Sequence, residues 1–167
     1  MANCVIILGK SGTGKSTSIK NLDPKSTVVF NTLGKMLPFK GSRSIFNKEN
    51  KNAFKPDELD FKNCSENYQK VKALLEMCNG APKIKNIILD DIIYVMRSEY
   101  FKRAKESGYG KYTELAQHFQ EIIKTCETLR EDLNVFFMLH SEDVMSDNTV
   151  VEYKVSTIGK LLDSQLI

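Results

Sequence analysis

A glycine-rich segment near the start of the chain constrains its fold more than any other feature. Residues 9–16 read GKSGTGKS and follow directly on the apolar run at residues 5–8. This G-x-x-x-x-G-K-[ST] pattern is typical of a strand that ends in a turn whose backbone N–H groups surround phosphate oxygens. Glycines permit the tight turn, and a helix that begins near Gly14 adds the positive end of its dipole. The pattern predicts a site for a nucleoside triphosphate.

The residues of this segment have distinct expected roles. Lys15 would reach the β- and γ-phosphates, and the Ser16 hydroxyl would coordinate the Mg²⁺ ion that bridges the same oxygens. A chance glycine-rich turn is the alternative, but here the pattern lies between a β-branched run and a short helix over residues 16–22 that Pro24 would end. We expect ATP or GTP to be bound by Gly9, Lys10, Ser11, Gly12, Thr13, Gly14, Lys15, Ser16 and Thr17.

A second apolar run ends in two acids. Residues 84–91 read IKNIILDD, which predicts a buried strand followed by a carboxylate. Neighbouring parallel strands bring their carboxyl ends together, so Asp90 could hold the water shell of the Mg²⁺ bound by Ser16. The alternative is that either acid caps a helix beginning near Ile92. Together with the phosphate-binding segment, the pattern favours Asp90 as the magnesium carboxylate.

The pattern of apolar residues predicts an α/β fold. Four unbroken apolar runs, at residues 5–8, 27–30, 84–89 and 135–139, are typical of parallel strands, and a short fifth strand is expected at 150–155. Apolar residues recur at helical spacing over 68–78 and 115–129. Alternating strands and helices indicate right-handed crossovers, and 167 residues suit one domain. We therefore predict a single three-layer domain over residues 1–167, with a mostly parallel sheet flanked by helices.

Charge and composition say less than the motifs about which kinds of partner the chain binds. The net charge is only +3, but residues 34–56 are basic and aromatic. Their one acid is Glu49, and their basic and aromatic residues are Lys35, Lys40, Arg43, Lys48, Lys51 and Lys55, and Phe39, Phe46 and Phe54. This stretch could track the backbone of a nucleic-acid strand, or it could be a solvated loop. The four cysteines form no C-x-x-C pair, which argues against a zinc site. The first apolar run is too short for a membrane span or a signal peptide, so we expect a cytoplasmic protein with no membrane partner.

Several segments together resemble a phage family of RecA-like ATPases, often called AAA-domain ATP-binding proteins, some of which act in single-strand annealing. The segments are GKSGTGKST, IILDD followed by Tyr94, SGYGKYTE, LRED, FFMLHSE and TIGKLLD, and they cover most of residues 5–163. The resemblance implies a RecA-like P-loop core that binds ATP and Mg²⁺. It further implies action on single-stranded DNA in phage recombination, annealing or replication, in the host cytoplasm and as a homo-oligomer. It also implies that the chain stops before the family's usual C-terminal segment.

The resemblance assigns further residues by position. His140, at the end of the fourth strand, would be the sensor that donates to the γ-phosphate or to its attacking water; a packed histidine is the alternative. Two mobile loops, at 107–112 and 141–150, would contact DNA, the first through Tyr109, Lys111 and Tyr112. The second loop is acidic. Plain surface loops are the alternative for both.

The catalytic base departs from the family pattern. RecA-like ATPases usually carry a glutamate beyond the second strand, whereas here that strand ends near Asn31, which cannot accept a proton. Asp91 is the expected substitute, with the polarisation of water as its role. We therefore expect an ATPase of slow turnover in which Lys15, Asp91 and His140 are catalytic, with Lys160 as a candidate finger because arginines are few. A nucleotide-switched scaffold that does not hydrolyse ATP is one alternative. A nucleotide or small-molecule kinase is another, although the arginine-rich lid usual in kinases is missing from the sequence.

Overall fold

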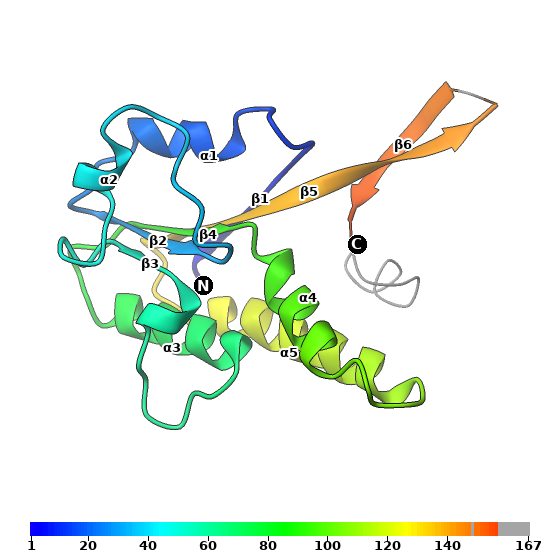
Figure 1. Ribbon diagram of the computed structural model, residues 1–167. Helices are drawn as coiled ribbons and strands as arrows, with labels where there is room; N and C mark the ends of the chain where they lie inside the picture. Colours follow the sequence, from blue (N-terminus) through cyan, green and yellow to red (C-terminus); the bar gives the residue numbers. More distant parts are fainter. Residues whose placement is uncertain (148, 157–167) are drawn as a thin grey trace.

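The computed structural model, whose described residues are 1–147 and 149–156, is built around one sheet (Figure 1). The strand order is β1-β5-β4-β2-β3, all pairs along it are parallel, and β6 pairs antiparallel with β5. The order separates β1 from β4 by one strand, β5, so the carboxyl ends of β1 and β4 lie on either side of the middle of β5. The strands are β1 (Asn3–Gly9), β2 (Thr27–Asn31), β3 (Ala53–Phe54), β4 (Asn86–Asp90), β5 (Asn134–Ser146) and β6 (Thr149–Val155).

Helices cover both faces of the sheet, which confirms the predicted three-layer α/β fold. In Figure 1, α1 and α2 lie on one face, and α3, α4 and α5 lie on the other. None of the helices in the described residues is long and apolar enough to cross a membrane. The helices are α1 (Lys15–Ser18), α2 (Ser42–Ile45), α3 (Asn67–Asn79), α4 (Ile93–Lys102) and α5 (Gly110–Glu127), with 3₁₀ turns η1 (Ile19–Asn21) and η2 (Pro56–Glu58).

The sheet separates two hydrophobic cores. Alternate side chains of a strand point to opposite faces, so Val28 and Phe30 of β2 enter the core beneath α3, α4 and α5, while Val29 enters the smaller core beneath η1. All three side chains are at most 1% exposed. Residues of this size each contribute about 1.5–3 kcal/mol when fully buried. Two-sided burial explains why β2 reads as an unbroken apolar run.

β1 differs from this pattern because it is an edge strand. Among the described residues it pairs only with β5. Val5, Ile6 and Leu8 are therefore 39%, 59% and 38% exposed. The apolar run predicted this strand correctly, but strand order, which decides burial, is not encoded in the run itself.

The prediction of a mobile loop at 141–150 is wrong. β5 continues to Ser146, and β6 begins at Thr149, so these residues form the two strands of a β-hairpin that projects from the sheet (Figure 1). Asp147, between the strands, has a φ of 47°, which suits a tight turn. The expected strand at 150–155 is confirmed. The segment at 157–163, TIGKLLD, and Lys160 within it lie outside the described residues.

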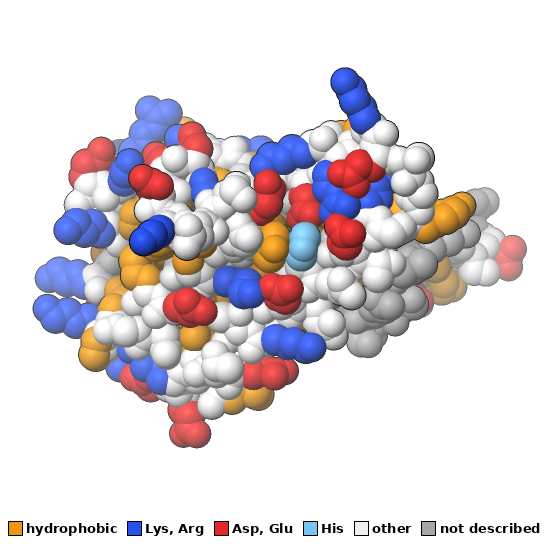
Figure 2. All heavy atoms as spheres, turned by 90° about the horizontal axis from the view of Figure 1, so that it is seen from below, with side chains coloured by type: hydrophobic (Ala, Val, Ile, Leu, Met, Phe, Trp, Pro, Cys, Tyr) orange, Lys and Arg blue, Asp and Glu red, His pale blue; other side chains and the backbone are white. Residues whose placement is uncertain are grey.

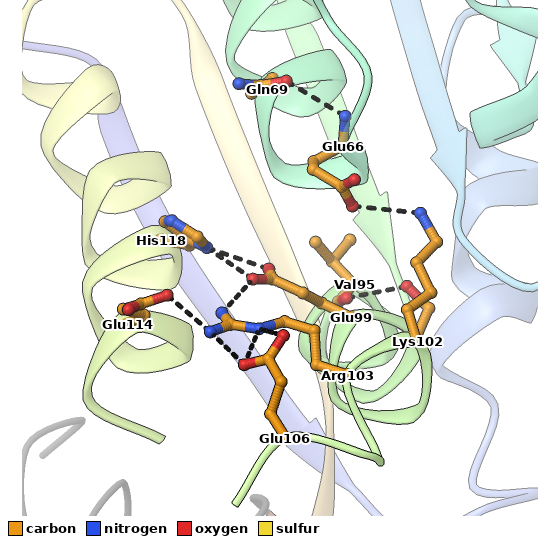
Figure 3. A network of polar contacts seen from close by, with 10 residues as sticks. Glu66, Gln69, Val95, Glu99, Lys102, Arg103, Glu106, Glu114 and His118 are labelled. Atoms are coloured by element: carbon orange, nitrogen blue, oxygen red, sulfur yellow. Dashed lines mark hydrogen bonds and ion pairs between the residues drawn. The ribbon is translucent and has the colours of Figure 1, made fainter. Parts of the chain in front are cut away.

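A buried carboxylate joins α4 to α5 (Figure 3). Glu99 is 6% exposed and lies 2.9 Å from Nδ1 of His118. The Arg103 guanidinium donates to the same carboxylate at 3.2 Å. The ring of Tyr68 on α3 stacks on His118, with ring centroids 3.9 Å apart. These contacts satisfy the buried charge and hold three helices together.

Candidate nucleotide site

The glycine-rich segment forms a loop between β1 and α1. Gly12 and Gly14 have φ angles of 81° and 97°, in the left-handed region that favours glycine. At Gly9, a Cβ atom would lie 2.9 Å from Oγ1 of Thr13, so this position admits only glycine without a shift. The Thr13 hydroxyl donates to the Lys10 carbonyl at 2.8 Å and closes the loop. The expected helix after the loop is short, because α1 tightens into η1 at Ile19.

Lys15 lies across this loop. Its Nζ donates to the carbonyl oxygens of Gly9 at 2.6 Å and Lys10 at 2.9 Å. An ammonium group has three donors and no acceptor. The loop therefore holds a positive charge at the point where phosphate oxygens would enter.

Ser16 and Asp90 meet as expected for a magnesium site. The Ser16 hydroxyl donates to Oδ1 of Asp90 at 2.8 Å. No side-chain hydrogen bond caps α4, so Asp90 and Asp91 do not act as helix caps. Mg²⁺ prefers oxygen ligands, and the hydroxyl of Ser16 and the carboxylate of Asp90 both supply oxygen atoms. These residues fit a Mg²⁺ ion, which would neutralise phosphate charge there.

Burial perturbs the Asp90 carboxylate. Asp90 is only 6% exposed, and this burial raises the pKa of its carboxyl from 3.8 to about 6. The hydrogen bond from Ser16 opposes this rise in pKa, the charge of Asp91 adds to it, and the charges of Lys15 and Lys35 oppose it. A bound cation would favour the ionised form, so this site is electrostatically suited to a metal ion.

His140 and Asp91, predicted on separate grounds, lie in contact. β5 places His140 in register with Gly9 of the phosphate loop. Nε2 of His140 is 2.9 Å from Oδ1 of Asp91, and their side chains are 22% and 16% exposed. The rings of Tyr94 and His140 pack edge-on, with their centroids 6.3 Å apart. Asp91 itself has a φ of 53°, a conformation that is strained for a residue other than glycine. The contact with Asp91 orients the imidazole beside the pocket.

These groups surround a pocket of about 300 Å³ at the carboxyl ends of the strands. Lys35, Met36 and Pro38 form a wall of the pocket that the motif did not reveal. Only Lys35 carried a signal in the sequence, as part of the basic stretch. The other lining residues were all expected: Ser11, Gly12, Gly14, Lys15, Ser16, Thr17, Asp90, Asp91 and His140. Gly9, Lys10 and Thr13 shape the loop instead.

The residues expected to contact DNA form an aromatic patch. Gly110, Lys111 and Tyr112 belong to α5 and not to a loop as expected. Tyr109 is 86% exposed, and Nζ of Lys111 lies 5.6 Å from the centre of the Tyr112 ring. Phe101, which the sequence did not single out, is 71% exposed. In Figure 1 the turn between α4 and α5 lies on the opposite side of the sheet from α1, which follows the phosphate loop.

Comparison with known proteins agrees with this geometry. A family model described as an AAA domain matches residues 1–161. This chain belongs to the AAA domain family. The AAA domain assignment confirms the expected family of nucleotide-binding P-loop ATPases, and it matches an α/β fold with the phosphate loop after β1. No curated protein matches this AAA domain, so the phage origin and the annealing branch stay predictions.

Proposed function

We propose that this AAA domain hydrolyses Mg²⁺-bound ATP and acts on single-stranded DNA in phage recombination, annealing or replication, in the host cytoplasm. The 2.8 Å contact between Ser16 and the buried Asp90, directly beside the phosphate loop, carries this proposal. Lys15 would exchange its two carbonyl partners for β- and γ-phosphate oxygens. Binding would thus replace contacts within the loop with contacts to the nucleotide.

The pair formed by His140 and Asp91 supports a role in hydrolysis. The imidazole could donate to the γ-phosphate or its attacking water, while Asp91 orients the ring and polarises the water. Asn31 lies opposite Asp90 in the β2–β4 register, and its amide donates to the Lys35 carbonyl. Because the Asn31 amide cannot accept a proton, Asp91 is the remaining candidate for the catalytic base. Asp91 already contacts His140, which is consistent with slow turnover.

A nucleotide-switched scaffold is the second candidate, favoured by the same observation. If Asp91 stays bound to His140 when ATP binds, the site can hold ATP without activating water. Binding would then change the order of the surrounding segments without turnover. Hydrolysis that disappears in Lys15→Ala would count against this alternative.

The aromatic patch supports the proposed action on single-stranded DNA. Tyr109 and Phe101 expose their rings, and Lys111 lies against Tyr100 and Tyr112. Bases of any sequence stack on exposed aromatic rings, and each stack contributes about 1–3 kcal/mol. We therefore assign Tyr109 and Tyr112 to stacking on bases and Lys111 to a phosphate contact in this proposal.

Assembly as a homo-oligomer is also proposed. Its support is the exposed apolar surface on β1 (Val5, Ile6 and Leu8) and on the hairpin, where Val151 and Tyr153 are 60% and 62% exposed. Apolar side chains gathered on the surface are typical of protein interfaces. Sedimentation with and without ATP would test this proposal, and a monomer under both conditions would refute it.

The decisive experiment measures Mg²⁺-dependent ATP hydrolysis with and without single-stranded DNA. The wild type, Lys15→Ala, Tyr109→Ala and Tyr109→Phe would be compared. We expect DNA to stimulate turnover, Lys15→Ala to abolish it, and Tyr109→Ala to weaken DNA binding about 5- to 150-fold. Tyr109→Phe keeps the ring and serves as the matched control. Turnover that DNA does not change, together with no DNA binding, would refute the DNA role.

A further inference from the structure

A second cavity lies beside the nucleotide pocket. It has a volume of about 430 Å³ and is lined by residues between Val29 and Glu58, at the carboxyl ends of β2 and β3. This size is typical of ligand pockets. Lys35 and Met36 line both this cavity and the nucleotide pocket. The two sites therefore share one wall.

Unpaired cations surround this second cavity. Lys35, Arg43, Lys48 and Lys55 line it, and all four are exposed. Within the part of the chain that the structure describes, none of them has a carboxylate within 4 Å, whereas Lys72, Lys85, Lys102, Arg103 and Arg130 are all in ion pairs. Figure 2 shows several lysine and arginine side chains, with some acidic ones among them, at the end of the molecule where β3 lies.

The two acids in the lining, Glu49 and Glu58, offset only part of the charge of the four cations. Glu58 accepts a hydrogen bond from the backbone N–H of Lys55 at 2.8 Å and completes a capping box of η2. Glu49, the other acid in the lining, is exposed and forms no ion pair among the described residues. Like charges that face one cavity repel one another unless an anion joins them. The cavity therefore favours an anionic ligand.

The aromatic residues of this stretch pack largely into the two cores, which corrects the sequence interpretation. Phe46 is 6% exposed and packs edge-on against Phe39, with ring centroids 6.2 Å apart. Both rings belong to the core beneath η1. The cavity thus presents exposed cations, whereas the two rings that line it, Phe46 and Phe54, are buried and half-buried. This combination favours contacts with phosphates over stacking with bases.

We infer that this cavity binds the phosphodiester backbone of single-stranded nucleic acid. A strand fits better than a single phosphate because the same stretch of chain carries two further exposed lysines, Lys40 and Lys51, which form no ion pair among the described residues. Lys35 and Met36 form the wall between this site and the nucleotide pocket, and the charge of Lys35 also interacts with Asp90. The inference rests on the proposed function and adds a backbone site to the aromatic patch on the α4–α5 turn.

The test compares two double variants of the full chain. Arg43→Gln with Lys48→Gln removes two charges from the cavity, and Lys83→Gln with Lys124→Gln removes two exposed lysines elsewhere. Binding of a labelled oligothymidylate is followed by fluorescence anisotropy at several salt concentrations, in the presence of a non-hydrolysable ATP analogue. Circular dichroism and ATP affinity check that each variant is folded.

The cavity variant should lose about 25-fold in affinity at about 0.1 M salt, and its salt slope should fall by about 1.4, because each lost phosphate contact removes about 0.7. The control variant should bind DNA like the wild type. Equal losses in both variants, or none in either, would overturn the cavity as the backbone site and leave the proposed function standing.

Two other outcomes would also overturn the inference. A wild type that binds no oligothymidylate would refute the DNA role and the backbone site together. Thymidine monophosphate, added with the ATP site filled, distinguishes a strand from a free phosphate. If the monophosphate binds as tightly as the oligomer and the cavity variant loses that binding, the ligand is a small phosphate ester.

Discussion

Replacing Asp90 with asparagine is expected to stabilise the metal-free protein at neutral pH. The folded protein raises the pKa of this carboxyl from 3.8 to about 6, chiefly by burial. Folding therefore favours the protonated acid, so the carboxylate lowers the stability of the fold progressively as pH rises from about 4 to 6 and fully above that. At about 1.4 kcal/mol for each pKa unit, the penalty reaches up to about 3 kcal/mol.

Asparagine removes this penalty and retains an oxygen that can accept the Ser16 hydroxyl. Urea unfolding followed by circular dichroism, in a chelator, should show Asp90→Asn more stable than the wild type by up to about 3 kcal/mol at about pH 8 and no different at about pH 3. Asp60→Asn, at an exposed position, is the matched control and should leave the free energy of unfolding unchanged.

The same variant tests the magnesium site when nucleotide is present. With Mg²⁺ and ATP at a hundred times the dissociation constant, the wild type should gain about 2.7 kcal/mol in the free energy of unfolding, and Asp90→Asn should lose most of that gain.

Two results would refute this reasoning. If Asp90→Asn is no more stable than the wild type at about pH 8, burial does not penalise the carboxylate as its surroundings indicate. If the difference in the free energy of unfolding is the same at every pH, it comes from packing and not from ionisation. A variant that keeps the full stabilisation by Mg²⁺ and ATP would remove Asp90 from the magnesium site.

Three further variants and one matched control test the site and the helix cluster. Lys15→Ala should weaken ATP binding about 10- to 150-fold in calorimetry, because a charge-assisted contact is worth about 1.5–3 kcal/mol; unchanged affinity would exclude Lys15 from the phosphates. His140→Ala should lower the hydrolysis rate on the order of 100-fold and keep ATP affinity; loss of affinity alone would contradict a sensor role. Glu99→Gln should cost about 1–3 kcal/mol in urea unfolding, because an amide replaces the buried carboxylate that both His118 and Arg103 contact. Glu106→Gln, on the exposed side of the same network (Figure 3), should cost far less, and equal losses would contradict the importance of burial.

Local patterns made the phosphate loop and four strands predictable. Gly12 and Gly14 adopt the left-handed turn that the spacing implied, and the unbroken apolar runs became parallel strands. The meeting of Ser16 with Asp90 followed from one further rule, that parallel strands end at the same edge. Chemistry that depends on neighbouring strand ends was therefore within reach of the sequence.

Features that depend on distant partners were not predictable. The exposure of Ile6 follows from strand order, and the two-residue β3 is too short to have a pattern. The wall formed by Lys35 and Met36 depends on where the segment after β2 folds back. Glu99 reads as a solvated acid on a helix, and only the packing of α5 places His118 beside it. In each case tertiary contacts outweighed local propensity.

The continuity of β5 has a mechanical consequence. His140 is the seventh of its thirteen residues, so the strand runs about 20 Å beyond the nucleotide pocket to Ser146, at about 3.3 Å per residue. Asp143 on this extension forms a 2.6 Å ion pair with Lys10 of the phosphate loop. A rotation of the strand at His140, which lines the nucleotide pocket, would be amplified along this extension. A tilt of about 5° at His140 would move the tip by about 2 Å, enough to exchange one set of surface contacts for another while the pocket hardly changes.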